Sequence, residues 1–246
     1  MTIKTTTIGG LDIAALSMNE LVDRMADDCR RRGRQPARLV FDANGQALSM
    51  CQTDPSYRAA LAEADIIHAD GQFLIWASRL RGGAAIPERT ATTDFIWAAA
   101  ARAERDGLSF YLLGGPPGLA ERARDRLLAR YPRLKIVGTR HGFFGPEEED
   151  AVVDEINASG ADVVWVGLGK PREQTFAARQ KHRSSAPWVV TCGGCFNFVT
   201  GEYKRAPDWM QRTGIEWLHR MFTGPRGLVR RYLVTTPHAL YLALTK

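Results

Sequence analysis

The sequence predicts an α/β fold: a mostly parallel, Rossmann-like sheet flanked by helices, with a C-terminal helical appendage. Short apolar runs alternate with amphipathic stretches from about Arg38 onward, which is the pattern of βα units. Several apolar runs end in Gly or Asp directly before a helical pattern, where α/β folds place ligands. After Gly201 the pattern changes to arginine-rich segments with bulky aromatic residues. We therefore divide the chain into a core, residues 1–201, and an appendage, residues 202–246.

The apolar runs of the core predict six strands, in order Arg38–Asp42, Asp65–His68, Ser109–Leu113, Lys135–Thr139, Asp162–Gly167 and Trp188–Thr191. An N-terminal helical pattern precedes them. Further amphipathic stretches predict helices near Ser56–Glu63, Gln72–Leu80, Thr93–Arg105, Gly118–Arg130, Glu147–Ser159 and Arg172–Arg183. In the appendage, Pro207 and Pro225 each open a helical pattern, because proline is well tolerated in the first turn of a helix.

Length and composition are those of an ordinary globular protein. The chain has 246 residues, 45% of them hydrophobic and 24% charged, which argues against a disordered or fibrous protein. No signal-peptide pattern and no uninterrupted apolar run of membrane-spanning length is present, so we expect a cytoplasmic protein. Its four cysteines are then expected to be free thiols.

The excess positive charge lies entirely in the last part of the chain. Residues 1–202 carry 25 Lys and Arg against 25 Asp and Glu, whereas residues 203–246 carry eight against two. This asymmetry indicates an anionic partner: phosphate groups, anionic lipid or nucleic acid. Basic helices with Trp, Phe and Tyr on one face are suited to the headgroup region of anionic membranes. Packing of this segment onto the core and a nucleic-acid-binding arm are the alternatives.

Two strand ends carry candidate site residues. The glycine-rich turn Gly114–Gly118 closes a strand and opens a helix, so its backbone N–H groups could face a diphosphate. It matches neither a Walker A sequence nor a GxGxxG fingerprint, and a plain tight turn is the alternative. Asp70 follows an apolar strand and could accept a proton from a hydroxyl group, or it could cap the next helix. Asn44 could likewise cap a helix, or it could donate a hydrogen bond to a ligand.

Metal and redox chemistry are weakly indicated. The segment Cys192-Gly193-Gly194-Cys195 has the C-x-x-C spacing of redox dithiols, but zinc would require two further ligands, and no histidine has a suitable spacing. No Asp-x-Asp follows a strand. We therefore expect no metal and no cofactor, so that arginines or backbone amides would neutralise bound phosphates.

Several segments, in order along nearly the whole chain, together resemble the WecG/TagA/CpsF glycosyltransferase family. They are Asp42-Ala43-Asn44, Ala69-Asp70-Gly71, Glu88-Arg89 with Thr93-Asp94, Phe110–Gly115, Val137-Gly138 with Gly142–Phe144, Val166–Pro171, Gly193–Phe196, and Arg205–Gln211 through Gly214–Trp217, Arg220 and Arg230–Tyr232.

The resemblance implies an inverting, metal-independent enzyme of surface polysaccharide or teichoic acid biosynthesis. It would transfer a hexose-type sugar (N-acetylmannosamine, its uronic acid or glucose) from a UDP-sugar to a polyprenyl-diphosphate-linked acceptor. The enzyme would be cytoplasmic and peripherally attached to the inner face of the cell membrane. Its partners would include an anionic membrane surface and no nucleic acid. The resemblance does not specify whether the chain forms a homo-oligomer. Asp70 would be the general base. The candidate substrate-binding residues are Asn44, Arg89, Gly114, Gly115, Gly169, Gln174, Arg212, Arg220, Arg226, Arg230 and Arg231.

The sequence departs from the family pattern at two places. The family usually reads Pro-Lys-Gln-Glu where this chain has Pro171-Arg172-Glu173-Gln174, which leaves the roles of Glu173 and Gln174 open. Phe196-Asn197-Phe198 stands where the family often has Phe-Asp-Phe. The alternative function is a Rossmann-type nucleotide-binding redox protein that uses the glycine-rich turn or the Cys192/Cys195 pair.

Overall fold

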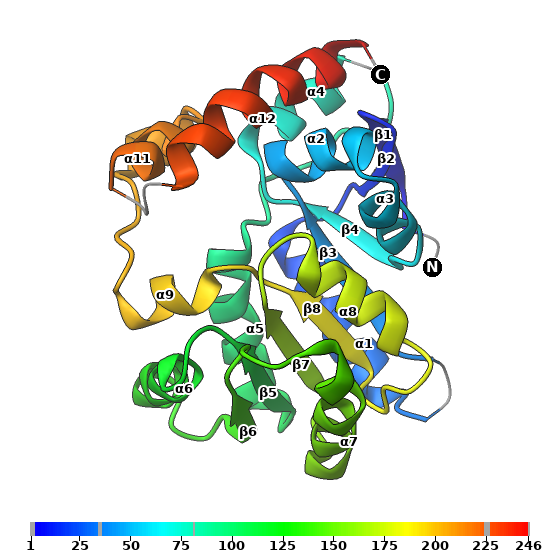
Figure 1. The fold of residues 1–246 in the computed structure, drawn as a ribbon, viewed down its shortest axis with the longest axis vertical. Coiled ribbons are helices and arrows are strands. Elements are labelled where there is room, and N and C mark those ends of the chain that lie inside the picture. The colour runs from blue at the N-terminus through cyan, green and yellow to red at the C-terminus, as the bar shows by residue number, and fades with distance from the viewer. Residues whose placement is uncertain (1–2, 34–35, 81, 224–226, 246) are drawn as a thin grey trace.

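The α/β class predicted from the sequence is confirmed. In a computed structural model that describes residues 3–33, 36–80, 82–223 and 227–245, one sheet of six parallel strands has the order β4-β3-β8-β7-β5-β6. Figure 1 shows this sheet at the centre of the molecule. In chain order its strands are β3 Arg38–Ala43, β4 Ile66–Ala69, β5 Ser109–Gly114, β6 Lys135–Arg140, β7 Val163–Gly167 and β8 Trp188–Thr191.

Helices cover both faces of the sheet, which is why the interiors of the central strands are apolar on both faces. Residues of one buried cluster come from α1 Met18–Arg30, α5 Thr92–Asp106, α6 Leu119–Arg130 and α9 Cys195–Thr200. The opposite cluster draws on α2 Gly45–Thr53, α3 Pro55–Ala62, α4 Gln72–Leu80, α7 Glu149–Ser159 and α8 Arg172–Gln180. A short 3₁₀ turn, Pro146–Glu148, precedes α7.

The connections after β5 and β7 lead to opposite faces of the sheet, to α6 and α8 respectively. The two strands end side by side, with Gly114 paired to Gly167. A Cβ on Gly114 would lie 2.2 Å from the carbonyl oxygen of Gly167, and the φ of Gly114 is +144°. Only glycine fits this position, so the close approach of the two backbones accounts for part of the glycine-rich turn.

An N-terminal β-hairpin is an element that the sequence analysis did not predict. Strand β1, Thr5–Ile8, pairs antiparallel with β2, Leu11–Ala14, across a two-residue Gly9-Gly10 turn. Both glycines have positive φ, which two-residue hairpin turns of this class require. The hairpin lies beside β4, the strand at one edge of the sheet. An edge strand covered in this way is protected from pairing with other chains.

The appendage contains three described helices: α10 Asp208–Arg212, α11 Glu216–Thr223 and α12 Gly227–Thr245. Figure 1 shows α12 running across α2 and α4 at one end of the molecule. Ala239, Leu242 and Ala243 of α12 are buried in the same cluster as the sheet, and His238 Nδ1 lies 2.9 Å from Ser49 Oγ of α2. The appendage therefore shares its apolar packing with the core. Pro225, expected to open the last helix, lies outside the described residues.

Candidate active site

A cavity of about 430 Å³ lies where the carboxyl ends of the parallel strands meet the appendage. Parallel α/β sheets bind their ligands at this edge. The polar side chains of its floor lie at or just beyond the carboxyl ends of β3, β4 and β7: Asp42, Asn44, Asp70, Lys170 and, from the first turn of α8, Glu173. Helices α11 and α12 supply much of the opposite wall, including Trp217, Arg220, Arg231, Tyr232 and Leu240.

Asp70 lies on this floor because the loop that follows β4 is tied to the neighbouring strand. Its backbone N–H donates to the carbonyl of Ala43, at 2.8 Å. Burial by itself would raise the pKa of the Asp70 carboxyl, but the positive charges of Arg89 and Arg220 outweigh it and hold this pKa below its ordinary value. Asp70 is therefore an ionised carboxylate at neutral pH, placed among arginines.

Asn44 caps a helix and also contacts two carboxylates of the cavity. Its Oδ1 accepts the backbone N–H of Ala47 at 3.1 Å and so caps α2, a helix that was not predicted. Its Nδ2 lies 3.0 Å from Asp42 Oδ2 and 3.4 Å from Asp70 Oδ2. One side chain therefore starts a helix and contacts the candidate base.

The sequence analysis did not identify the ion pair between Asp42 and Lys170. Lys170 Nζ lies 2.6 and 2.5 Å from the two carboxylate oxygens of Asp42, and both side chains are almost fully buried. Each residue stands at or just beyond a strand end, which was the only signal in the sequence. Since β8 separates β3 from β7, the pairing becomes visible only in the folded sheet.

Glu173 connects two loops of the cavity floor. Its Oε2 accepts the backbone N–H of Gly169 at 3.0 Å and that of Gly193 at 2.9 Å. Gln174 Nε2 donates to Glu173 Oε1 at 3.1 Å and to Thr191 Oγ1 at 3.3 Å, and the Gln174 side chain is completely buried. Glu173 therefore holds the loops after β7 and β8 together. Gln174, which is not part of the cavity lining, hydrogen-bonds to Glu173 from the protein interior.

The predicted arginines divide into three groups. Arg89, Arg220 and Arg231 line the cavity. Arg89 Nη1 lies 2.9 Å from Glu216 Oε2. The guanidinium group of Arg220 lies over the ring of Phe198, 4.6 Å from its centroid. That of Arg231 lies over the ring of Tyr232, 4.7 Å from its centroid. Arg212 and Arg230 are exposed and lie outside the lining, and Arg226 lies outside the described residues. Of the predicted glycines, Gly169 lines the cavity, whereas Gly114 and Gly115 do not.

The model of the glycosyl transferase WecG/TagA/CpsF family matches residues 6–246. The match includes the core, the cavity and the appendage. The chain belongs to this family. A glycosyltransferase needs a cavity that holds a sugar donor beside an acceptor group. The cavity at the strand ends is the candidate, and it is lined by the ionised carboxylate of Asp70, the ion pair of Asp42 with Lys170 and several arginines.

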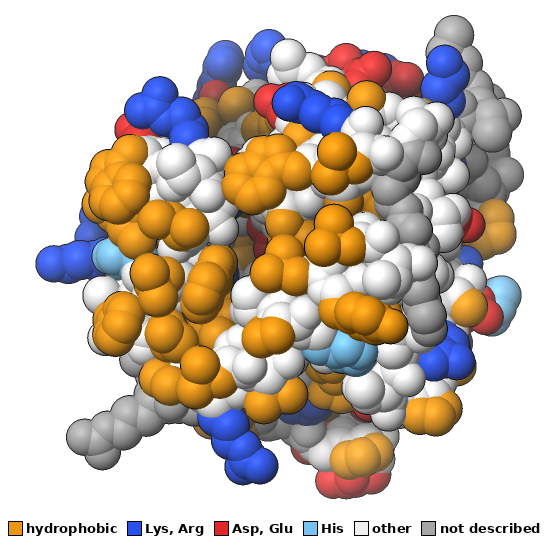
Figure 2. Space-filling model, turned by 90° about the horizontal axis from the view of Figure 1, so that it is seen from above, with side chains coloured by type: hydrophobic (Ala, Val, Ile, Leu, Met, Phe, Trp, Pro, Cys, Tyr) orange, Lys and Arg blue, Asp and Glu red, His pale blue; other side chains and the backbone are white. Residues whose placement is uncertain are grey.

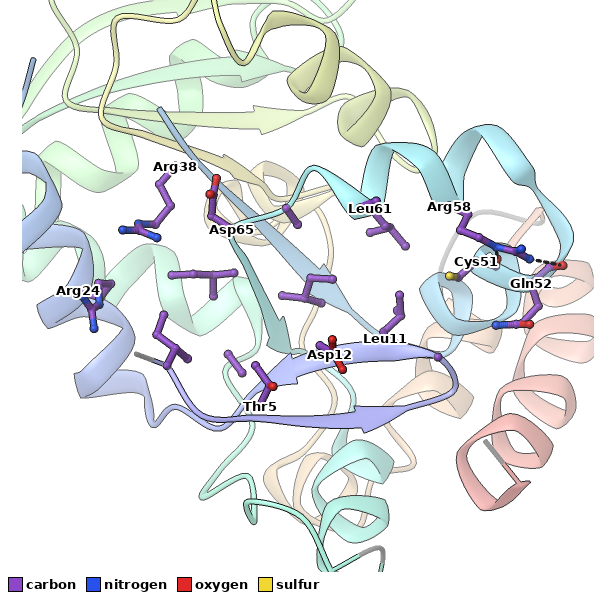
Figure 3. Close-up of a pocket in the computed structure, with 17 residues that line it drawn as sticks. Thr5, Leu11, Asp12, Arg24, Arg38, Cys51, Gln52, Arg58, Leu61 and Asp65 are labelled. Carbon is purple, nitrogen blue, oxygen red and sulfur yellow. Dashed lines mark hydrogen bonds between the residues drawn. The ribbon is translucent and has the colours of Figure 1, made fainter. Parts of the chain in front are cut away.

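A second cavity, of about 780 Å³, lies between the N-terminal hairpin, α3 and β4 (Figure 3). Several of its charged groups already bind other parts of the protein. Arg38 pairs with Asp28, and Arg58 donates to the carbonyls of Cys51 and Gln52. The smaller cavity, in which Asp70 and three arginines line one space at the carboxyl ends of the strands, is the candidate glycosyltransferase site.

The thiols of Cys192 and Cys195 also line the site cavity, but both are buried and free. Burial raises the pKa of each thiol well above its ordinary value, so both are protonated at neutral pH. A protonated thiol is a poor nucleophile and a poor metal ligand. Within the described ranges, no group of three or more His, Cys, Asp or Glu side chains is arranged to hold a metal ion.

Glu173→Gln should leave the glycosyltransferase folded and active, with a rate within about threefold of the wild type. Burial raises the pKa of Glu173 to about 7, so a neutral group is tolerated there, and an amide oxygen can accept the same two backbone N–H groups. Glu173→Ala leaves both N–H groups without an acceptor and should cost about 1–3 kcal/mol of stability for each. Thermal unfolding and initial rates of both variants test this, and equal damage by the two would contradict it.

Arg220→Gln should move the acid limb of the pH–rate profile to higher pH. Arg220 helps to hold the pKa of Asp70 low, so its removal raises that pKa and lowers the ionised fraction of Asp70 at any acidic pH. The measurement is kcat/KM from the lowest pH at which the enzyme stays folded, about pH 3, up to pH 8. Arg124→Gln, on the exposed surface of α6, is the control and should keep the wild-type profile. If the acid limb of Arg220→Gln is unchanged, the ionisation of Asp70 does not control the pH dependence of kcat/KM.

Proposed function

We propose that this glycosyltransferase transfers a hexose-type sugar from a UDP-sugar to a polyprenyl-diphosphate-linked acceptor, with inversion and without a metal, in surface polysaccharide or teichoic acid biosynthesis. N-acetylmannosamine, its uronic acid and glucose are the candidate sugars. The observation that carries the proposal is the position of ionised Asp70, in one cavity with Arg89, Arg220 and Arg231.

The proposed chemistry is a single displacement. The acceptor hydroxyl oxygen attacks C1 of the sugar, and the bond from C1 to the β-phosphate oxygen breaks and leaves its electron pair on UDP. Asp70 receives the hydroxyl proton as the new bond forms. Because its pKa is lowered, Asp70 is a weak base before attack, and it also orients the hydroxyl through a hydrogen bond.

Arginine is the proposed counter-charge for the departing diphosphate. Arg231 Nε is buried and has no hydrogen-bond partner among the described residues, although its residue lines the cavity. A buried donor without a partner costs free energy that a bound anion would recover. Arg220, on the neighbouring helix, lines the same cavity.

An exposed apolar face beside the cavity supports the proposal of a membrane-bound acceptor. Figure 2 shows apolar side chains gathered on the end of the molecule that carries α12. Exposed members are Leu233, Val234, Leu240, Tyr241 and Leu244 of α12, Trp76 and Leu80 of α4, and Phe222 of α11. Trp76 and Leu240 also line the cavity, so the apolar face and the cavity adjoin.

We propose that this apolar face lies on the inner, anionic surface of the cell membrane. Arg79 of α4, Arg212 of α10 and Arg230 of α12 are exposed and would meet lipid phosphates. In the described part of the chain no helix is both long and apolar enough to cross a bilayer. Docking in the interface would bring the acceptor diphosphate to the cavity while the sugar donor enters from the aqueous side.

A thermal-shift panel tests the donor half of the proposal. Ligand at 100 times its Kd stabilises the folded state by about 2.7 kcal/mol, which raises the Tm of a domain of this size by several degrees. We expect UDP and at least one UDP-sugar to give this shift and NAD(P) to give none. A shift with NAD(P) alone would support the redox alternative and refute the transferase proposal.

A further inference from the structure

Asp42 and Lys170 form an ion pair on the cavity floor that fold stability alone does not explain. The side chains are 4% and 6% exposed, and Lys170 Nζ contacts both oxygens of the carboxylate. Taking two charges out of water is costly, and apolar replacements of such pairs are often as stable or more stable. A pair of this kind inside a site therefore points to a role in fixing geometry.

The pair continues into a chain of contacts that ends at the candidate base. Asp42 Oδ2, held by Lys170, lies 3.0 Å from Asn44 Nδ2 and is its hydrogen-bond acceptor. The other end of the Asn44 amide is held by the N–H of Ala47. Because both ends of the amide are fixed, the second hydrogen on Nδ2 is left to face Asp70 Oδ2, at 3.4 Å.

Lys170 is held as a charged partner of Asp42. Burial would lower the pKa of its ammonium group, but Asp42 outweighs burial and keeps this pKa above its ordinary value. The lysine therefore stays charged and paired, and it cannot serve as a proton acceptor. Glu173 Oε1 lies 3.8 Å from the same Nζ, and Glu173 in turn holds the backbone on either side through Gly169 and Gly193.

We propose that Asp42 and Lys170 are positioning residues that orient the Asn44 amide and, through it, the Asp70 carboxylate toward the acceptor hydroxyl. This inference rests on the proposed function for its catalytic consequence. Misplacement of a reacting group by about 1 Å can cost about 100-fold in rate, so loss of the pair should lower the transfer rate without preventing donor binding.

The kinetic test is a double-mutant cycle. Lys170→Met in the full chain should lower kcat about 10- to 100-fold, with the KM for the UDP-sugar within about threefold. Asn44→Ser removes the Nδ2 donor but retains a good helix cap. If Lys170 acts through Asn44, adding Lys170→Met to Asn44→Ser should lower kcat no further. Losses that multiply would overturn the proposal.

A matched control separates positioning from general damage. Asp28 is also buried and paired with a cation, since it lies close to Arg38 Nε and accepts the indole N–H of Trp188 at 2.9 Å. Asp28→Asn should lower the Tm but leave kcat at the wild-type value. If Lys170→Met fails to fold, the double variant Asp42→Asn/Lys170→Met takes its place in the cycle, because it removes both charges and leaves neither buried without a partner.

Crystal structures test the positional claim without any turnover. In wild-type crystals we expect Asn44 Nδ2 to face Asp70 Oδ2, and in Lys170→Met we expect the Asn44 amide to be rotated away from Asp70. An Asn44 amide that still faces Asp70 in the variant would overturn the positioning proposal, whatever the activity. A wild-type enzyme that transfers no sugar, together with a rotated amide in the variant, would refute the proposed function while retaining the positioning role.

Discussion

Asp70→Asn is expected to lower the rate of sugar transfer by about 100- to 10,000-fold, the usual contribution of a general base. Asparagine has nearly the same shape but cannot accept the hydroxyl proton. Donor binding should persist, because the proposed contacts to the diphosphate come from Arg220 and Arg231. The measurement is the initial rate of product formation by mass, together with the shift in Tm that the UDP-sugar causes.

The control for Asp70→Asn is a carboxylate that lies outside the site cavity. Asp65 Oδ2 accepts the backbone N–H of Leu39 at 2.8 Å, at the amino end of β3 and away from the cavity. Asp65→Asn retains an acceptor there and should transfer sugar at the wild-type rate. If Asp70→Asn keeps more than about a tenth of the wild-type rate, a base role for Asp70 is refuted, and only an orienting role for this side chain is left.

Leu233→Glu/Val234→Glu/Leu244→Glu is expected to lower binding to anionic liposomes at least tenfold. These α12 side chains are 63%, 63% and 71% exposed, so the substitutions remove apolar contact area and add negative charge without disturbing the core. Burying one such side chain is worth about 1.5–3 kcal/mol, and tenfold in binding corresponds to only about 1.4 kcal/mol. Co-sedimentation with vesicles measures the effect.

Phe143→Glu provides the matched control for the apolar face. Phe143 is 66% exposed but follows β6, at the opposite edge of the sheet from the hairpin, and it is no part of the apolar face. Its substitution should leave sedimentation unchanged. The triple variant should also keep the donor-induced shift in Tm, since none of its three residues lines the cavity. Equal sedimentation of the triple variant and the wild type would place the membrane contact elsewhere.

Hydrophobic patterning predicted the sheet well because strands buried on both faces read as near-continuous apolar runs. The predicted strand Trp188–Thr191 and the predicted helix Gln72–Leu80 agree with β8 and α4 at both ends. The N-terminal hairpin was missed because its first strand, Thr5–Ile8, contains only one apolar residue, and its signal is the Gly9-Gly10 pair between the strands. Helix α2 was missed because its apolar periodicity is weak and its cap, Asn44, had a second interpretation.

The apolar pattern predicted site residues only at strand ends, whereas Arg89, Arg220 and Arg231, which also line the cavity, came from the family resemblance. Asp70, Asn44 and Gly169 were found at strand ends, and all three line the cavity. The pairing of Asp42 with Lys170 depends on strand order, which a single sequence does not reveal. The glycines Gly114 and Gly115 share the same edge of the sheet, but the structure explains Gly114 by its contact with Gly167.

The charge excess after residue 202 predicted an anionic partner, and the structure places the residues that carry it in different settings. Arg205 contacts Asp94 and Glu216, and Glu216 also pairs with Arg89, so these groups fasten α11 to the start of α5. Glu216 had no assigned role in the sequence analysis. Charge counts cannot distinguish arginines that fasten one helix to another from arginines that line a cavity, because the two differ only in their folded neighbours.

The central claim is tested most directly by a donor screen with a short-chain polyprenyl-diphosphate-linked sugar as acceptor, read by the mass of the lipid product. The account predicts that one UDP-sugar increases the acceptor mass by a single hexose-type residue and releases an equal amount of UDP, and that Asp70→Asn lowers this yield. Release of UDP without any gain in acceptor mass, for every donor tested, would contradict the proposed transfer.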